Sequence, residues 1–214
     1  MDIKLDQEDI KKMDRKYRLN LINSLSGIKP ANLIGTRSKS GINNLAIFSS
    51  VVHLGSNPAQ FGFILRPQTK NPRDTFRNIQ ETNFYTINHV SHLMIRKAHY
   101  TSAKLKFEES EFERMNIEEE FLDGFSAPFV KNSKVKMGMK FIDNLLLPNG
   151  CSIVIGEAVK IIFPKEAIND LGQLNLESYS CAGISGLNTY YSLRKLQSFP
   201  YVRNDEFPDF MNDQ

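Results

Sequence analysis

The sequence predicts a mainly β fold with peripheral helices, on the basis of three observations. The chain has 214 residues, of which 41% are hydrophobic and 24% charged, as is typical of a globular protein that buries one core. Short segments rich in β-branched and aromatic residues recur along it, separated by Gly, Pro, Asn and Ser turns. We count six or seven such strands against three or four helices. No repeat or linker divides the chain.

The N-terminal segment is predicted to be helical, because apolar residues recur at helical spacing at Ile10, Met13, Tyr17 and Leu21. We expect residues 1–26 to form an amphipathic helix that packs on the main domain. That domain is expected to span residues 27–197. Residues 198–214 follow as an aromatic tail, which packs either on its own domain or across a neighbouring subunit.

The hydrophobic period changes at Ala31, where the strands begin. The predicted strands are residues 31–36, 45–54, 61–65, 84–90, 135–141 and 151–163. The first three have short connections, which fits a meander or a Greek key. Asn71 as N-cap and Pro72 as first helical residue predict a helix through residues 75–81. Ser110 and Glu113 match a capping box before a second short helix.

Charge and cysteine content narrow the class of protein. A net charge of +3 identifies no partner by itself. Cys151 and Cys181 lie among small or apolar residues, which disfavours a disulfide scaffold and fits a reducing cytoplasm. The highly charged N-terminus lacks the apolar core of a signal peptide, and polar residues interrupt every long uncharged stretch. We therefore expect a cytoplasmic protein that does not span a membrane.

Several catalytic signatures are missing, including the Walker P-loop, GxGxxG, GxSxG and HExxH. The four histidines, His53, His89, His92 and His99, have no carboxylate or cysteine at ligand spacing. We predict no metal site, and no catalytic residue is identified.

Two polar features could bind a ligand. Asn44, Ser49 and Ser50 lie in a strand where the pattern calls for a core, so they either bond to neighbouring backbone or present donors and acceptors to a flat heterocycle. Downstream, basic residues surround the predicted helix start, with Asp74 opposing them and Thr75 adding a hydroxyl. They are Arg66, Lys70, Arg73 and Arg77. This cluster is either a solvated basic face or a phosphate site at a helix N-terminus.

The order NLAIFSSVVHLGSNPAQFGFILRP, PRDTFRNIQETNFYTINHV, TSAKLKFEESEFERMNI and SIVIGEAVKI resembles the flavin reductase-like family of FMN-binding split barrels, which includes flavoredoxin-like proteins. The resemblance covers residues 27–191 and is strongest over 41–90. It implies a homodimeric split β-barrel of Greek-key type, with FMN bound near the subunit interface.

The resemblance also implies site residues. Those placed beside the isoalloxazine and ribityl chain are Asn44, Leu45, Ala46, Ser49 and Ser50. Those that would hold the phosphate are Arg66, Arg73, Thr75 and Asn78. Asn88 and His89 would flank the flavin or its phosphate.

Three functions stay open. The first is an NAD(P)H-dependent flavin reductase, in which hydride passes from nicotinamide C4 to flavin N5 and no protein nucleophile is required. The second is a non-enzymatic FMN electron-transfer protein. The third is a basic barrel that binds single-stranded nucleic acid, with Phe61 and Phe63 as stacking groups. We favour the NAD(P)H-dependent flavin reductase, and we do not expect the protein to bind nucleic acid. His53 would point toward the flavin or brace the barrel.

Overall fold

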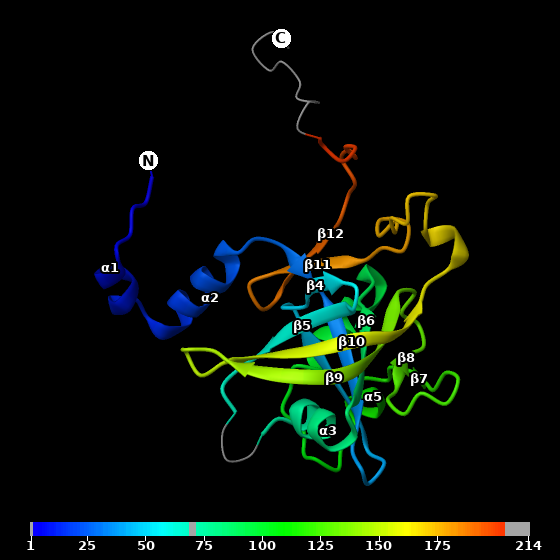
Figure 1. The fold of residues 1–214 in the computed structure, drawn as a ribbon. Helices are drawn as coiled ribbons and strands as arrows, with labels where there is room; N and C mark the ends of the chain where they lie inside the picture. Colours follow the sequence, from blue (N-terminus) through cyan, green and yellow to red (C-terminus); the bar gives the residue numbers. More distant parts are fainter. Residues whose placement is uncertain (1, 69–71, 204–214) are drawn as a thin grey trace.

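A curled seven-stranded antiparallel sheet forms the body of the protein (Figure 1). The structure is a computed structural model and describes residues 2–68 and 72–203. The strand order is β3–β2–β6–β9–β10–β5–β4. The strands are β2 Asn32–Arg37, β3 Asn43–Phe48, β4 Val52–Ser56, β5 Ala59–Leu65, β6 Phe84–His89, β9 Lys136–Leu146 and β10 Ser152–Ile162.

The connection between β3 and β4 forces this sheet to curl. These strands lie at opposite ends of the sheet order, yet only residues 49–51 separate them in the chain. Ser50 links the two edges, because its Oγ accepts the Ile64 N–H of β5 at 3.0 Å. No ladder joins β3 to β4 in the described residues, so the barrel is split there.

Smaller elements cover the barrel. β1 Lys29–Pro30, β11 Ala182–Ser185 and β12 Thr189–Ser192 form a three-stranded sheet, and β7 Glu119–Glu120 pairs with β8 Phe129–Val130. The helices after the N-terminal segment are α3 Asp74–Thr82, η1 His92–Met94, α4 Ile95–Tyr100, α5 Glu111–Arg114 and η2 Lys165–Ala167. α3 packs on β2 and β3, while α4 and α5 pack on β3. The predicted mainly β fold with peripheral helices is confirmed.

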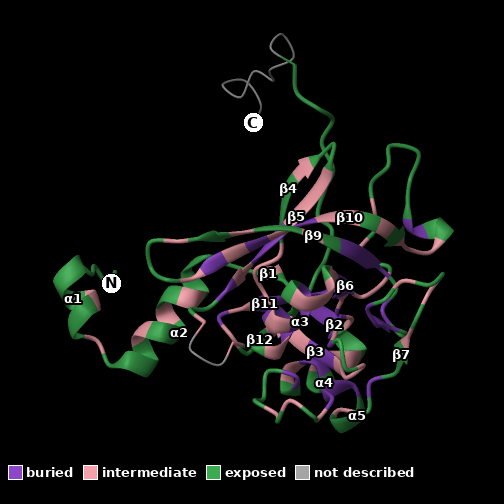
Figure 2. Ribbon diagram, turned by 60° about the horizontal axis from the view of Figure 1, so that its bottom comes forward, coloured by how far each residue is buried: buried purple, intermediate pink, exposed green. Residues whose placement is uncertain are grey.

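The alternation along the strands builds two apolar cores (Figure 2). One includes Ile34, Phe63, Tyr85 and Val154 and fills the barrel under α3. The other includes Leu33, Leu45 and Phe112 and lies on the opposite face of β2 and β3. Gly156 lets the barrel core close, since a Cβ there would lie 2.2 Å from the Tyr85 hydroxyl.

The predicted elements need three adjustments. The predicted strand 45–54 is broken at residues 49–51, where the chain crosses between the two edges of the sheet. The predicted helix at 75–81 is confirmed as α3, but its N-cap is Arg73, and Asn71 lies outside the described residues. Ser110 is the N-cap of α5 but makes no side-chain capping bond, so the predicted capping box does not form.

The N-terminal segment differs from the expected single packed helix. It forms two helices, α1 Gln7–Lys12 and α2 Arg15–Leu25, because Asp14 caps a new helix start after Met13. Neither helix contains a buried residue, and both stand away from the barrel (Figure 1). The packing expected for residues 1–26 is therefore wrong within this chain.

The described part of the C-terminal segment also stays exposed. Phe199 is 73% and Tyr201 is 90% exposed, so neither packs on its own domain. Phe207 and Phe210 lie outside the described residues.

Candidate functional site

The polar strand and the basic helix start meet at one end of the barrel. Asn44 of β3 donates from Nδ2 to Thr75 Oγ1 in the first turn of α3 at 3.1 Å. The same amide lies 3.2 Å from Thr36 Oγ1 of β2. The structure thus brings the polar strand around Asn44 into contact with the start of α3 at Thr75.

Thr36 is the centre of this buried network. Its Oγ1 accepts from Asn44 and also from Asn78 Nδ2, at 3.1 Å. Asn78 is 1% exposed, and its buried Oδ1 has no partner. Its side chain anchors α3 to the sheet through the bond to Thr36. The role of Asn78 as a phosphate ligand stays a prediction.

Thr75 keeps a donor for a ligand, although only 4% of the residue is exposed. Its oxygen accepts the Asn44 amide, while the hydroxyl proton remains to be donated. Thr75 can therefore serve both the network and a bound anion.

Arg66 and Arg73 are the exposed part of the site. Arg66 follows β5 and Arg73 caps α3, and neither pairs with a carboxylate in the described residues. Gln68 holds the loop, since its Oε1 accepts the Arg73 N–H at 2.9 Å. The first amides of the nine-residue helix α3 are free of intrahelical acceptors. Two guanidinium groups at a helix N-terminus match the chemistry of a phosphate site.

Arg77 does not contribute to this cluster. Its guanidinium pairs with Asp74 and lies 3.6 Å over the ring of Phe107. Arg77 is therefore engaged within its own chain, neither fully solvated nor free for a ligand. Lys70 lies outside the described residues.

The flavin strand shows a similar division. Ala46 and Ser49 are half-buried, and Ser49 makes no side-chain hydrogen bond in the described residues. Ser50 bonds to the backbone of Ile64, as the simpler interpretation of this strand expects. Leu45 is fully buried in the core opposite the barrel interior, so its side chain does not line a ligand surface.

Glu111 of α5 holds this strand from outside the sheet. Its Oε2 accepts the Leu45 N–H at 3.0 Å, and the residue is only 6% exposed. Burial raises the pKa of this carboxyl, Asp74 and Glu109 add to the rise, and the Leu45 N–H opposes it. Glu111 replaces the missing strand neighbour at the edge of β3.

Asn88 supports the scaffold. It is fully buried, donating to Leu33 O at 3.1 Å and to Thr86 Oγ1 at 2.9 Å, while its Oδ1 accepts the Val130 N–H at 3.0 Å. These bonds connect β6 to its neighbours and use both amide protons of Asn88. The contact of Asn88 with the flavin or its phosphate stays a prediction.

His89 faces Cys181, with 3.6 Å between Nδ1 and Sγ. Burial lowers the pKa of His89 to about 4 and raises the pKa of the Cys181 thiol. Both groups are therefore neutral at pH 7, and His89 carries no positive charge toward a phosphate.

The two expected roles of His53 stay predictions. It is exposed on the β4–β5 hairpin, where its Nε2 lies 3.3 Å from Ser56 Oγ and its ring meets Phe61 edge-on. Phe63 is fully buried, which removes one stacking group of the nucleic-acid interpretation.

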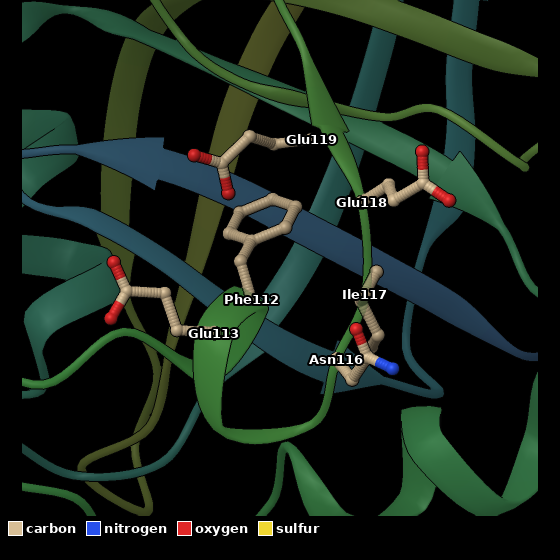
Figure 3. A pocket seen from close by; sticks show the side chains of 6 residues that line it. All are labelled: Phe112, Glu113, Asn116, Ile117, Glu118 and Glu119. Carbon is tan, nitrogen blue, oxygen red and sulfur yellow. The ribbon is translucent and has the colours of Figure 1, made fainter.

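Two hollows of the described chain lie away from these residues. One, of about 250 Å³, is lined by Phe112, Ile117, Asn116 and the carboxylates of Glu113, Glu118 and Glu119 (Figure 3). A second, of about 560 Å³, lies between residues 166–177 and 193–198. No predicted flavin residue lines either hollow, and the acidic rim of the first opposes an anionic ligand.

Comparison with known proteins decides the family. Residues 28–177 match the family described as "Flavin reductase like domain". The chain belongs to the flavin reductase-like family. A structure from Shewanella frigidimarina, provisionally described as a flavin reductase with a split barrel domain, is 43% identical, with 94% of this chain and 100% of that one covered and a TM-score of 0.90.

Two more distant structures share the fold of this flavin reductase-like chain. Nitrilotriacetate monooxygenase component B from Bacillus cereus is 18% identical over 93% of this chain and 99% of that one, with a TM-score of 0.81. An FMN-binding protein from Thermus thermophilus is 12% identical over 81% of this chain and 90% of that one, with a TM-score of 0.66. The predicted split barrel and family are confirmed, and they give the chain a flavin-related oxidoreductase function with a flavin cofactor.

No group of three His, Cys, Asp or Glu side chains in the described residues could hold a metal ion. Within the same residues, no helix has the length and apolarity needed to cross a membrane.

Two residues of the site, Thr36 and Glu111, were not predicted from the sequence. Thr36 ends a predicted strand and could have been suspected as a polar partner of Asn44. Glu111 lies in the predicted capping box, and no local pattern connects it to a strand 66 residues away.

Proposed function

We propose that the protein is an FMN-dependent oxidoreductase that takes its electrons from NAD(P)H. The observation that carries this proposal is the pair of exposed residues Arg66 and Arg73, which follow β5 and cap α3 respectively. Both lie within the part of the chain that matches the flavin reductase-like family. FMN carries a phosphate and riboflavin does not, so this basic pair favours FMN.

The residues have separate tasks in this proposal. Arg66, Arg73 and the hydroxyl of Thr75 would bind the phosphate, while Ala46 and Ser49 would lie beside the ring. Glu111 and the Thr36 network hold β3 and α3 in place. When bound, FMN supplies the redox chemistry, which explains why no nucleophile or metal is needed.

We also propose that a homodimer completes the site. The described residues around Ser49, Arg66 and Arg73 line neither hollow, whereas cofactor sites usually enclose most of their ligand. A second copy would supply the missing wall.

The free thiols of Cys151 and Cys181 fit the reducing cytoplasm expected from the sequence.

Two measurements test the function. The purified protein should absorb at about 450 nm after incubation with FMN. The FMN-loaded protein should oxidise NADH or NADPH with an added electron acceptor. Flavin binding without any nicotinamide oxidation would instead identify an electron-transfer protein, and absence of flavin binding would refute both.

A further inference from the structure

The N-terminal arm, residues 2–28, is the longest described segment without a buried residue. On α2, Tyr17, Leu21 and Leu25 recur every four residues and form one apolar stripe. Tyr17 is 60% and Leu25 is 71% exposed. Nothing in the described chain covers this stripe.

The arm is nevertheless built as an ordered element. Asp6 and Asp9 form a reciprocal capping box on α1, and Asp14 accepts the Lys16 and Tyr17 N–H groups at the start of α2. Arg18 Nη1 donates to Lys11 O at 2.9 Å across the junction of the two helices.

The root of the arm is fixed because β1 pairs with β11. An isolated 11-residue helix is marginal in water, so α2 needs a packing partner.

The exposed area indicates how large that partner is. The chain exposes 14510 Å², whereas a compact chain of 24.5 kDa exposes roughly 10,100 Å². An upper-bound allowance for the residues outside the described ranges is about 2,650 Å². Roughly 1,800 Å² of excess remains, which is the order of area that a chain buries in a large homodimer.

The barrel of the same chain carries a second uncovered apolar surface. It lies on the outer face at one end of the sheet, where the exposed side chains of Val52 and Leu54 of β4 and Leu145 of β9 flank Ile153 of β10. In a two-fold dimer, the arm of each copy can cover this surface on the other copy. The two-fold axis repeats the contact, so the stripe and the barrel surface are buried on both copies.

We infer that the two copies exchange arms, with the Tyr17–Leu21–Leu25 stripe of each copy packed on the β4, β9 and β10 surface of the other. The inference rests on the proposed homodimer and not on flavin binding. The arm leaves the barrel at β1 and points away from it, so its stripe is open to another molecule (Figure 1).

Photo-crosslinking tests the exchange. The photoreactive amino acid p-benzoylphenylalanine is placed at Leu25 in one variant and, as matched control, at Leu19 in another. Leu19 lies on the opposite side of α2 and is 44% exposed. After illumination at micromolar concentration, a contact between copies doubles the 24.5 kDa mass on a denaturing gel. We expect this product from position 25, joined to peptides of residues 52–54 or 145–153, and at least about tenfold less from position 19.

Other outcomes overturn the inference. If light scattering shows a dimer but position 25 gives no intermolecular product, the arm is free or packs on its own barrel. Equal yields from both positions contradict the stripe, and a monomer refutes both the arm exchange and the homodimer.

Hydrogen exchange provides an independent measurement. Amides of residues 15–25 should exchange at least about tenfold faster in Leu25→Glu than in Leu19→Glu, while β6 stays protected in both variants.

Discussion

The two sides of the candidate flavin site differ in what their polar groups already bind. On the buried side, Asn44 donates to Thr36 of β2 and to Thr75 of α3, and Asn88 donates to Leu33 O of β2. On the exposed side, Arg66 and Arg73 have no carboxylate partner in the described residues. Polar groups with internal partners maintain the fold, whereas those without remain available for a ligand. Substitutions should therefore separate the two sides, the first changing stability and the second changing only cofactor affinity.

The largest effect should come from Asn88→Ala. It removes the Asn88 side chain from Leu33 O and from the Val130 N–H, and it leaves the Thr86 hydroxyl with Pro128 O as its remaining side-chain hydrogen-bond partner. We expect a loss of about 2–4 kcal/mol in the free energy of unfolding. The matching fall in Tm, by calorimetry, is about 5–15 °C. Asn20→Ala, at an exposed position of α2, is the control and should leave Tm nearly unchanged. An Asn88 variant as stable as the wild type would remove this residue from the scaffold.

The next effect should come from Arg66→Ala and Arg73→Ala. A hydrogen bond between a guanidinium and a phosphate contributes about 1.5–3 kcal/mol, so each variant should bind FMN roughly ten- to a hundredfold more weakly. Riboflavin lacks the phosphate and should bind nearly as before, and Tm should not change. Titration of the apo variants with both flavins measures the contrast.

Arg96→Ala, at an exposed position of α4, is the matched control for these variants. If FMN affinity stays the same in both site variants, or if riboflavin affinity falls equally, the basic pair is only a solvated surface.

Glu111→Gln should have a smaller effect, visible as a change with pH. The pKa of Glu111 is raised in the folded protein, mainly by burial. Its contribution to stability is therefore fully present below the ordinary carboxyl pKa and is lost as pH rises through the raised one. Gln keeps an oxygen for the Leu45 N–H but does not titrate. The variant should gain stability relative to the wild type as pH rises from 4 to 7, measured by urea unfolding.

Glu113→Gln, an exposed neighbour on α5, is the control for this pH dependence. A stability difference between Glu111→Gln and the wild type that does not vary with pH would contradict the assignment.

Local patterns predicted the barrel strands and α3 because these elements depend on alternation and on helix-start chemistry that neighbours in sequence supply. The roles of Asn78 and Asn88 could not be obtained in the same way. Each has the residue type expected of a ligand, and only the folded contacts with Thr36, Leu33 and Val130 show that its donors are used internally.

The arm shows the same limit. Its periodicity predicts an apolar stripe but does not identify the surface that the stripe packs on. β11 and β12 were not predicted, because their short segments between glycines carry too little periodicity.

The smallest effect is expected from the double variant Cys151→Ser, Cys181→Ser. The sequence places no basic residue beside either cysteine, but the fold brings His89 within 3.6 Å of Cys181. A reactive thiolate would need a positively charged imidazole beside it. In such an ion pair the pKa of the histidine is raised and the pKa of the thiol is lowered. Burial has the reverse effect here: it lowers the pKa of His89 to about 4 and raises the pKa of the Cys181 thiol. Both groups therefore stay neutral. We therefore expect flavin affinity and turnover within about twofold of the wild type, and a stability loss of no more than about 1–2 kcal/mol from the buried Cys181. Alkylation of the native wild-type protein by iodoacetamide should proceed slowly at Cys181. Rapid alkylation there, or loss of activity in a double variant that still folds, would show that the thiol takes part in the chemistry.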